Sequence, residues 1–168
     1  PFSFLSWQVW SVTTYASGAP GNITYNLSIS KVAVDSGYTV LPDNGVKVYL
    51  TLNTLVEDKE IQDAIDMLIS LYEHGLDAVI LQDIGLASLI HKVLPDLHMH
   101  ASTQMSAYSL EQVKFLESLG FKRVVLAREL TLEEIKYITS NTEVEIEAFI
   151  HGALCVSVSG QCLMSLAI

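Results

Sequence analysis

Hydrophobic and polar residues follow two alternating rhythms along the chain from Gly45 onward. Short apolar runs rich in β-branched and aromatic side chains are typical of buried strands. Between them lie longer segments whose apolar residues recur at the spacing of an amphipathic helix. The predicted strands are 45–53, 77–82, 97–102, 122–127 and 144–150, and the predicted helices are 57–75, 83–95, 109–120 and 131–141.

Residues at the ends of the predicted helices support these boundaries. Thr131 and Glu134 have the spacing of a capping box, in which the two side chains accept hydrogen bonds from backbone amides of the first turn. Gly75 and Pro95 stand where helices stop, because glycine tolerates a left-handed backbone and proline cannot continue the helix. Strands and helices that alternate with short connections predict a parallel sheet with helices packed outside it.

This alternation favours a (β/α) barrel. No Gly-x-Gly-x-x-Gly motif follows a predicted strand, which argues against a doubly wound dinucleotide-binding sheet. We therefore predict an α/β fold, part of a TIM-like (β/α) barrel with about five βα units, too few to close the eight-stranded form. We expect residues 45–168 to form this partial domain, truncated at its C-terminus. Residues 1–44, rich in Ser, Thr, Tyr, Gly and Asn, are predicted to be an atypical segment, either disordered or read in a shifted frame.

Composition narrows the function classes. The chain has 168 residues, half of them hydrophobic, which suffices for one buried core. Its net charge of −10 argues against a broad basic surface that grips nucleic acid by charge alone, although a local basic groove remains compatible. No apolar run reaches the roughly 18 residues of a membrane span, and the start lacks the basic n-region of a signal peptide. A cytoplasmic protein without a membrane segment is predicted.

Polar side chains follow the predicted strands where the chain leaves the sheet. In a barrel these strand ends surround one pocket, so such residues are candidates for binding and catalysis. Each also has a structural interpretation: Arg128 and Glu129 could form a surface pair, and the polar residues at 102–104 could simply cap a turn. Glu145 and Glu147 could face a polar barrel interior. The candidate catalytic residues are His100, Gln104, Arg128, Glu147 and His151.

The chain has two cysteines, Cys155 and Cys162, and both lie in one loop of glycine and serine residues. Their spacing leaves three interpretations open: buried apolar thiols, a redox dithiol, or part of a metal or iron–sulfur site. A cluster usually takes four thiolates, and two are present here. His98 and His100 share a strand face as a second possible ligand pair, but no carboxylate stands at ligand spacing.

The cysteine loop resembles a known family. The segment EAFIHGALCVSVSGQCLMS (147–165) is similar to the signature of the U32 peptidase family, the collagenase-like proteins. HASTQM (100–105) and RVVLARELTLEEI (123–135) resemble its long forms, so the resemblance covers residues 45–168. The positions that match the signature are Glu147, Phe149, Gly152, Ala153, Leu154, Cys155, Gly160, Cys162 and Ser165.

This resemblance implies a barrel-like domain and an iron–sulfur enzyme. Family members bind a [4Fe–4S] cluster through four cysteines; Cys155 and Cys162 match the first two, and the other two are expected beyond Ile168. Several members hydroxylate RNA bases or a ubiquinone precursor without using molecular oxygen. For those that modify RNA, prephenate is the implied source of the oxygen atom. Ribosomal or transfer RNA is therefore the expected substrate of the intact protein. His100, Gln104 and Arg128 are expected to contact an anion or substrate.

Residues 1–44 depart from the family pattern, because they lack its APAG-like first strand and its Gly-Ala-Asp-Ala-Val-Tyr strand. Two other functions therefore stay open. The family name implies a collagenase-like peptidase, in which a serine or cysteine of the loop would need His151 or His100 as its base. The third alternative is a non-catalytic binding subunit or an inactive fragment, and the chain alone is expected to be inactive.

Overall fold

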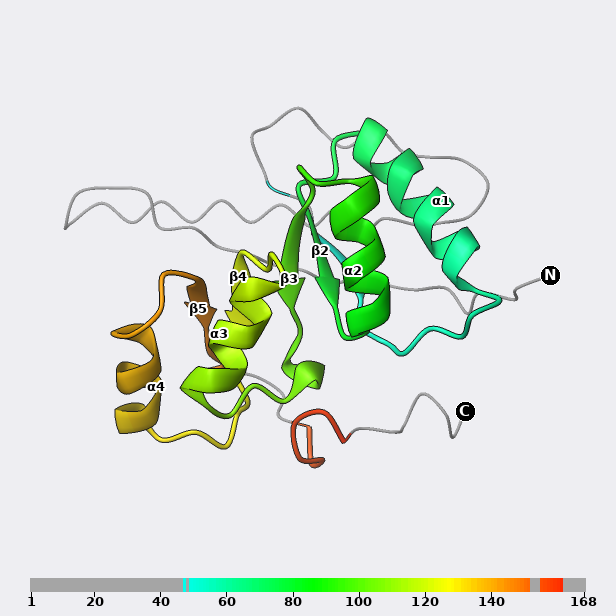
Figure 1. Ribbon diagram of the computed structural model, residues 1–168. Coiled ribbons are helices and arrows are strands. Elements are labelled where there is room, and N and C mark those ends of the chain that lie inside the picture. Colours follow the sequence, from blue (N-terminus) through cyan, green and yellow to red (C-terminus); the bar gives the residue numbers. More distant parts are fainter. Residues whose placement is uncertain (1–46, 48, 152–154, 162–168) are drawn as a thin grey trace.

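The computed structural model describes residues 47, 49–151 and 155–161, so the predictions for residues 1–44 and for Cys162 lie outside the described residues. Parallel strands and helices alternate along the described chain, as Figure 1 shows. The strands are β1 (Tyr49–Leu52), β2 (Ala78–Leu81), β3 (His98–Ala101), β4 (Arg123–Val125) and β5 (Glu145–Glu147). The helices are α1 (Ile61–Glu73), α2 (Ile84–Val93), α3 (Leu110–Ser118), α4 (Leu132–Thr139) and the short 3-10 helix η1 (Thr103–Met105).

The predicted alternation is confirmed, and the observed elements are shorter than predicted. The helix predicted from residue 57 begins at Ile61, because a turn closed by Glu60 N–H donating to the Glu57 carbonyl precedes it. The capping box is present: Thr131 Oγ1 accepts from Glu134 N–H, and Glu134 accepts from Thr131 N–H at 2.8 Å. The helix η1 was not predicted, because three residues carry no periodic pattern.

The strand order confirms the barrel type of fold. Neighbouring strands pair in parallel in the order β1-β2-β3-β4-β5, so each strand lies beside its predecessor. The α-helices lie over the same face of the sheet in Figure 1. A doubly wound sheet would reverse its strand order and place helices on both faces, whereas a (β/α) barrel adds each unit on one side of the last.

The hydrophobic core lies between the sheet and the helices. Val79, Met99 and Val124 project from three neighbouring strands and are buried against helix residues such as Leu68 and Ile90. Successive strand residues point to opposite faces, so the alternate positions of the same strands form the other face of the sheet. That face is more polar, and it carries Tyr49, His100, Arg123 and Glu145.

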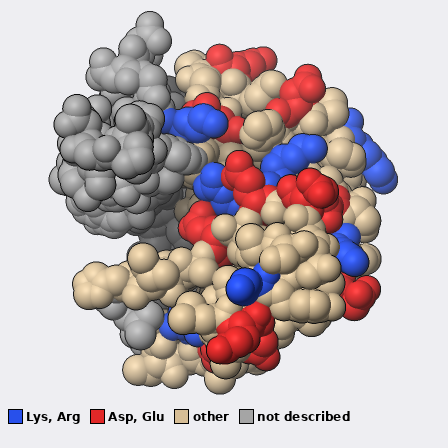
Figure 2. All heavy atoms as spheres, turned by 90° about the vertical axis from the view of Figure 1, so that its left-hand side faces the viewer, with Lys and Arg blue, Asp and Glu red and all other residues tan. Residues whose placement is uncertain are grey.

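The face of the molecule that Figure 2 shows is mixed in charge. Acidic and basic side chains are interspersed over the face that bears β5 and α4 (Figure 2). None of the helices in the described part of the chain is long and apolar enough to cross a membrane.

Candidate functional site

The loop of residues 155–161 lies at the C-terminal ends of the strands, beside η1 (Figure 1). Arg128, which follows β4, binds this loop through all three nitrogen atoms of its guanidinium group. Its Nη1 donates to the Cys155 carbonyl at 2.8 Å, and its Nη2 donates to the Ser157 carbonyl. Its Nε and its backbone N–H both donate to Ser159 Oγ, at 3.3 and 3.1 Å. One arginine therefore contacts three alternate residues of the loop.

Glu129 holds the same loop from the neighbouring position. Its Oε1 accepts from Ser159 N–H at 3.0 Å, and its Oε2 accepts from the Tyr108 hydroxyl at 3.1 Å. The hydrogen bond from Ser159 N–H is the main reason that the pKa of Glu129 lies below its ordinary value. Arg128 and Glu129 thus bond to the loop, not to each other as the simple surface pair that the sequence also allowed.

Gly160 brings the loop into close contact with the segment after β3. Its φ of +79° is in the left-handed region, and a Cβ there would lie 1.8 Å from Ser106 Oγ and 2.9 Å from the Gln104 carbonyl oxygen. Ser106 itself has a φ of 54° and donates from Oγ to the Ser159 carbonyl at 2.9 Å. A side chain at position 160 would therefore separate two segments that this contact joins.

A cavity of about 390 Å³ opens between the loop and the ends of β4 and β5. Three of the candidates from the sequence meet there: Arg128, His151 and Cys155. Arg128 supplies charge, His151 an imidazole and Cys155 an exposed thiol. The complete lining is Arg128, Glu129, Phe149, Ile150, His151, Cys155, Val156, Ser157 and Val158. Apolar side chains beside a few polar groups are a common lining for an organic ligand.

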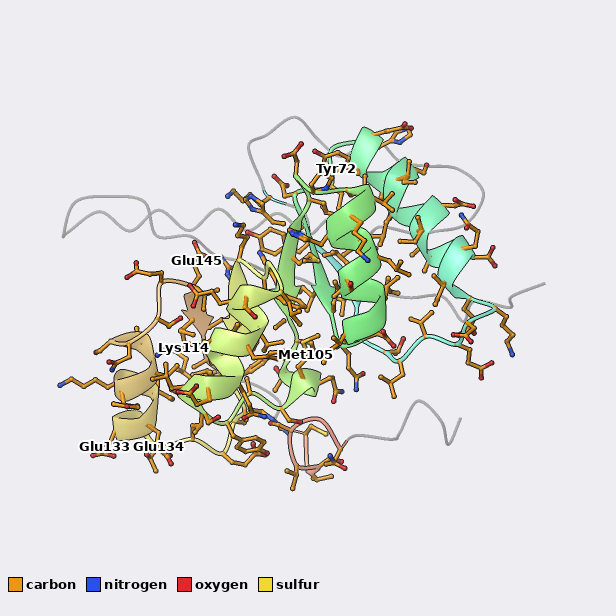
Figure 3. All side chains as sticks on the ribbon, viewed as in Figure 1. Tyr72, Met105, Lys114, Glu133, Glu134 and Glu145 are labelled. Atoms are coloured by element: carbon orange, nitrogen blue, oxygen red, sulfur yellow. The ribbon has the colours of Figure 1, made fainter. Side chains whose placement is uncertain are left out.

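His100 and Glu147 belong to a different cluster, on the polar face of the sheet. Arg123 donates from Nε and Nη2 to Glu145 at 2.9 and 2.7 Å and from Nη1 to Glu147 at 3.2 Å. Its guanidinium carbon lies 5.6 Å from the centroid of the Tyr49 ring. Figure 3 shows Glu145 at the opposite end of the sheet from Met105 of η1, and therefore away from the cysteine loop.

His100 is buried, with 5% of its surface exposed, and its ring meets the Tyr49 ring edge to face at 4.8 Å. Burial and the nearby Arg123 charge lower the pKa of His100 to about 4, so this imidazole is neutral near pH 7. The structure thus places His100 inside the sheet, and it does not join the cavity beside the cysteine loop.

Gln104 lies in η1, and its carbonyl oxygen is close to Gly160, so its backbone supports the loop. Ser102 accepts from Gln104 N–H at 3.2 Å, as the capping interpretation of residues 102–104 expected. Neither Ser106 nor Arg123 was predicted as a site residue from the sequence. Ser106 stands in a left-handed conformation that no local pattern marks, and Arg123 was visible only as the polar start of an apolar strand.

The described residues include one cysteine of the loop in which an iron–sulfur cluster is expected. No group of three or more His, Cys, Asp or Glu residues in the described part of the chain could hold a metal ion. Cys155 is exposed and lines the cavity, within a loop of small residues, so it fits as one thiolate ligand. Cys162 lies outside the described residues. The loop is therefore compatible with the expected cluster, and the described residues contain one of the two expected ligands, Cys155.

The serines of the loop do not form a protease-like pair. Ser159 is 3% exposed, and its hydroxyl oxygen accepts from two nitrogens of Arg128. Within the described ranges, neither Ser157 nor Ser159 is hydrogen-bonded to a histidine. A serine nucleophile requires an adjacent base, so this geometry does not favour the peptidase interpretation for these two residues.

Comparisons with known proteins agree with the resemblance seen in the sequence. The family model described as Peptidase family U32 matches residues 24–168, beginning upstream of residue 45, where the resemblance was drawn. The chain is 46% identical over 121 residues to the 23S rRNA 5-hydroxycytidine C2501 synthase of Escherichia coli (strain K12), covering 72% of this chain and 18% of that protein. It is 40% identical over 122 residues to tRNA hydroxylation protein P of the same organism, covering 72% and 27%.

A solved structure also matches. The U32 peptidase Mk0906 superposes with a TM-score of 0.53 at 19% identity, over 62% of this chain and 45% of that one, which supports the fold alone. The chain spans less than a third of the length of either curated relative.

Proposed function

This chain belongs to peptidase family U32, and from that premise we propose that the whole protein hydroxylates a base of ribosomal or transfer RNA. The observation that carries the proposal is the identity of 46% and 40% to two proteins whose names describe RNA hydroxylation. The loop geometry supports it, because Cys155 stands on the edge of a cavity large enough for a planar ring. We place the protein in the cytoplasm, where these RNAs are made and modified.

Cys155 and Cys162 would hold a [4Fe–4S] cluster together with two further cysteines outside this chain. When bound, such a cluster supplies electron transfer, or a Lewis-acidic iron that can activate an oxygen donor, for which we propose prephenate. The residues of this chain then have separate tasks. Arg128 and Glu129 hold the loop, Phe149 and Val158 would present apolar surface to a base, and His151, which lines the cavity, would exchange a proton there.

The acidic character of the chain limits how it can contribute to RNA binding. With a net charge of −10, this region would not attract the phosphate backbone by charge alone. We therefore assign RNA capture to other parts of the whole protein and assign to this domain the handling of one unstacked base.

The test is complementation followed by nucleoside analysis. The whole protein is expressed in E. coli cells that lack their own 5-hydroxycytidine synthase, and in a second strain that lacks tRNA hydroxylation protein P. Digested ribosomal and transfer RNA are analysed by mass spectrometry for hydroxylated nucleosides. Restoration in one strain, lost in Cys155→Ser, supports the proposal and identifies the RNA class. No restoration in either strain, from a soluble protein that carries its cluster, would refute it.

The peptidase alternative rests on the family name and on the description of the matched solved structure. It predicts gelatin or collagen hydrolysis by protein that carries no iron, and loss of that activity when the nucleophilic serine or cysteine of the loop, or its histidine base, is replaced. The same purified protein can be assayed for both activities. Absence of both activities in a folded, cluster-loaded protein would favour the third alternative, a non-catalytic binding subunit.

A further inference from the structure

We propose that Arg128 is a positioning residue that holds the cysteine loop in its ligand-presenting conformation before any cluster binds. The inference rests on the proposed function only where it concerns iron. The sequence suggested that Arg128 contacts an anion or substrate, but its contacts in the structure are with the loop. Its side chain donates to the carbonyls of Cys155 and Ser157 and to the hydroxyl of Ser159.

Arg128 is well placed for this role because its own position is fixed. It follows β4, whose residues Val124 and Val125 are buried, and the next two residues, Leu126 and Ala127, are buried as well. Its backbone N–H also donates to Ser159 Oγ at 3.1 Å. The guanidinium therefore connects a rigid strand end to residues 27 to 31 positions later in the sequence.

Polar contacts, and not hydrophobic packing, hold the loop. Val156 and Val158 are exposed, so they contribute little to a core, and Ser159 is the buried residue among those described in the loop. The contacts that join the loop to η1, Ser106, Arg128 and Glu129 are hydrogen bonds and the close approach at Gly160. Arg128 supplies several of these hydrogen bonds, so its loss should release more of the loop than the loss of any other single side chain.

The geometry also explains why the residue is arginine. The guanidinium is planar and presents donors along several directions at once, which lets it reach two carbonyls and one hydroxyl together. A lysine ammonium carries the same charge at one point, and it could not keep all three contacts. If Arg128 acted through its charge alone, Arg128→Lys would preserve its role; if it acts through its shape, Arg128→Lys would fail.

The first experiment measures the loop without any cluster. Hydrogen–deuterium exchange of the whole, iron-free protein is followed in peptides that cover residues 155–161. We expect Arg128→Gln and Arg128→Lys to speed exchange in this segment by about tenfold or more, because several hydrogen bonds of the loop are lost together. Arg123→Lys is the matched control: it changes the other arginine of the chain, at the far end of the sheet, and should leave the segment at the wild-type rate.

The second experiment measures iron. The same variants are reconstituted anaerobically, and iron per chain is compared with the absorbance of the cluster. Wild type should reach about four iron atoms per chain, and both Arg128 variants half of that or less, while Arg123→Lys loads like wild type. Wild-type exchange rates in Arg128→Lys, or full iron in Arg128→Gln, would overturn the inference. If wild type binds no iron, the proposed cofactor fails, and the exchange result still decides the role of Arg128 in positioning the loop.

Discussion

The contact at Gly160 gives a prediction whose magnitude can be worked out from the structure. Gly160→Ala would place a Cβ at a φ of +79° and 1.8 Å from Ser106 Oγ. Gly75→Ala provides the matched control, because Gly75 has a φ of +94° and a Cβ there would meet nothing within 4 Å. The two substitutions therefore share the backbone strain, and only the first adds a collision.

The two costs follow from these differences. Alanine in the left-handed region costs about 1–2 kcal/mol, and the lower entropy of the unfolded chain returns about 0.4–1 kcal/mol. Gly75→Ala should therefore lower local stability by about 1 kcal/mol. Gly160→Ala adds an overpacking cost of about 1–3 kcal/mol, for a total of about 2–4 kcal/mol. Because the loop lies outside the core, it should undock while the sheet stays folded.

Hydrogen exchange measures this local opening. Peptides that contain each glycine are followed in the whole protein, and 2 kcal/mol corresponds to an exchange rate about 30-fold faster. Adding Ser106→Gly to Gly160→Ala removes the nearest atom and should restore part of the protection; the Gln104 carbonyl oxygen at 2.9 Å prevents full recovery. Equal effects at Gly75 and Gly160, or no recovery in the double variant, would show that the loop does not dock as described.

Three other predictions concern residues away from the loop. Buried His100 is neutral in the folded protein above its pKa of about 4, whereas in the unfolded chain it takes up a proton below about pH 6.5. The free energy of unfolding should therefore fall by about 3 kcal/mol as the pH falls from 6.5 to 4. His100→Gln should make the free energy of unfolding depend less on pH over that range, and the same pH dependence as in wild type would contradict this. Thr131→Ala removes the capping box with Glu134 and should destabilise α4 by about 1 kcal/mol. Amide hydrogen exchange should then be faster in α4 and unchanged in α3, and wild-type exchange rates in α4 would count against this prediction. The hydrogen bond from Arg123 holds the pKa of Glu145 below its ordinary value, so Arg123→Met should raise that pKa in a carbon-detected NMR titration, and a constant value would refute the assignment.

Much of the fold could be predicted because its signals are local. Apolar periodicity distinguished the strands from the helices, and Thr131 and Glu134 marked a helix start that the structure confirms. The ends of the elements were less certain, as the late start of α1 at Ile61 shows. A pattern of apolar residues extends into turns that lie against the core, so it overstates the length of an element.

The candidate site was predicted in part. Arg128, His151 and Cys155 do lie together, because strands of one parallel sheet end at the same edge. His100 and Glu147 lie elsewhere, because both are within strands, where side chains point to one or the other face of the sheet and not beyond the strand end. Their proximity to the strand ends in sequence did not reveal which direction their side chains take.

The sequence by itself determined the order of the elements, the type of barrel and the cysteine loop that marks the family. Only the tertiary structure decided that Arg128 binds the loop and that Gly160 must remain small at Ser106. The physical reason is the range of the interactions. Helix and strand patterns repeat within a few residues, whereas the contacts of Arg128 join residues about 30 positions apart, whose meeting depends on how neighbouring strands end side by side.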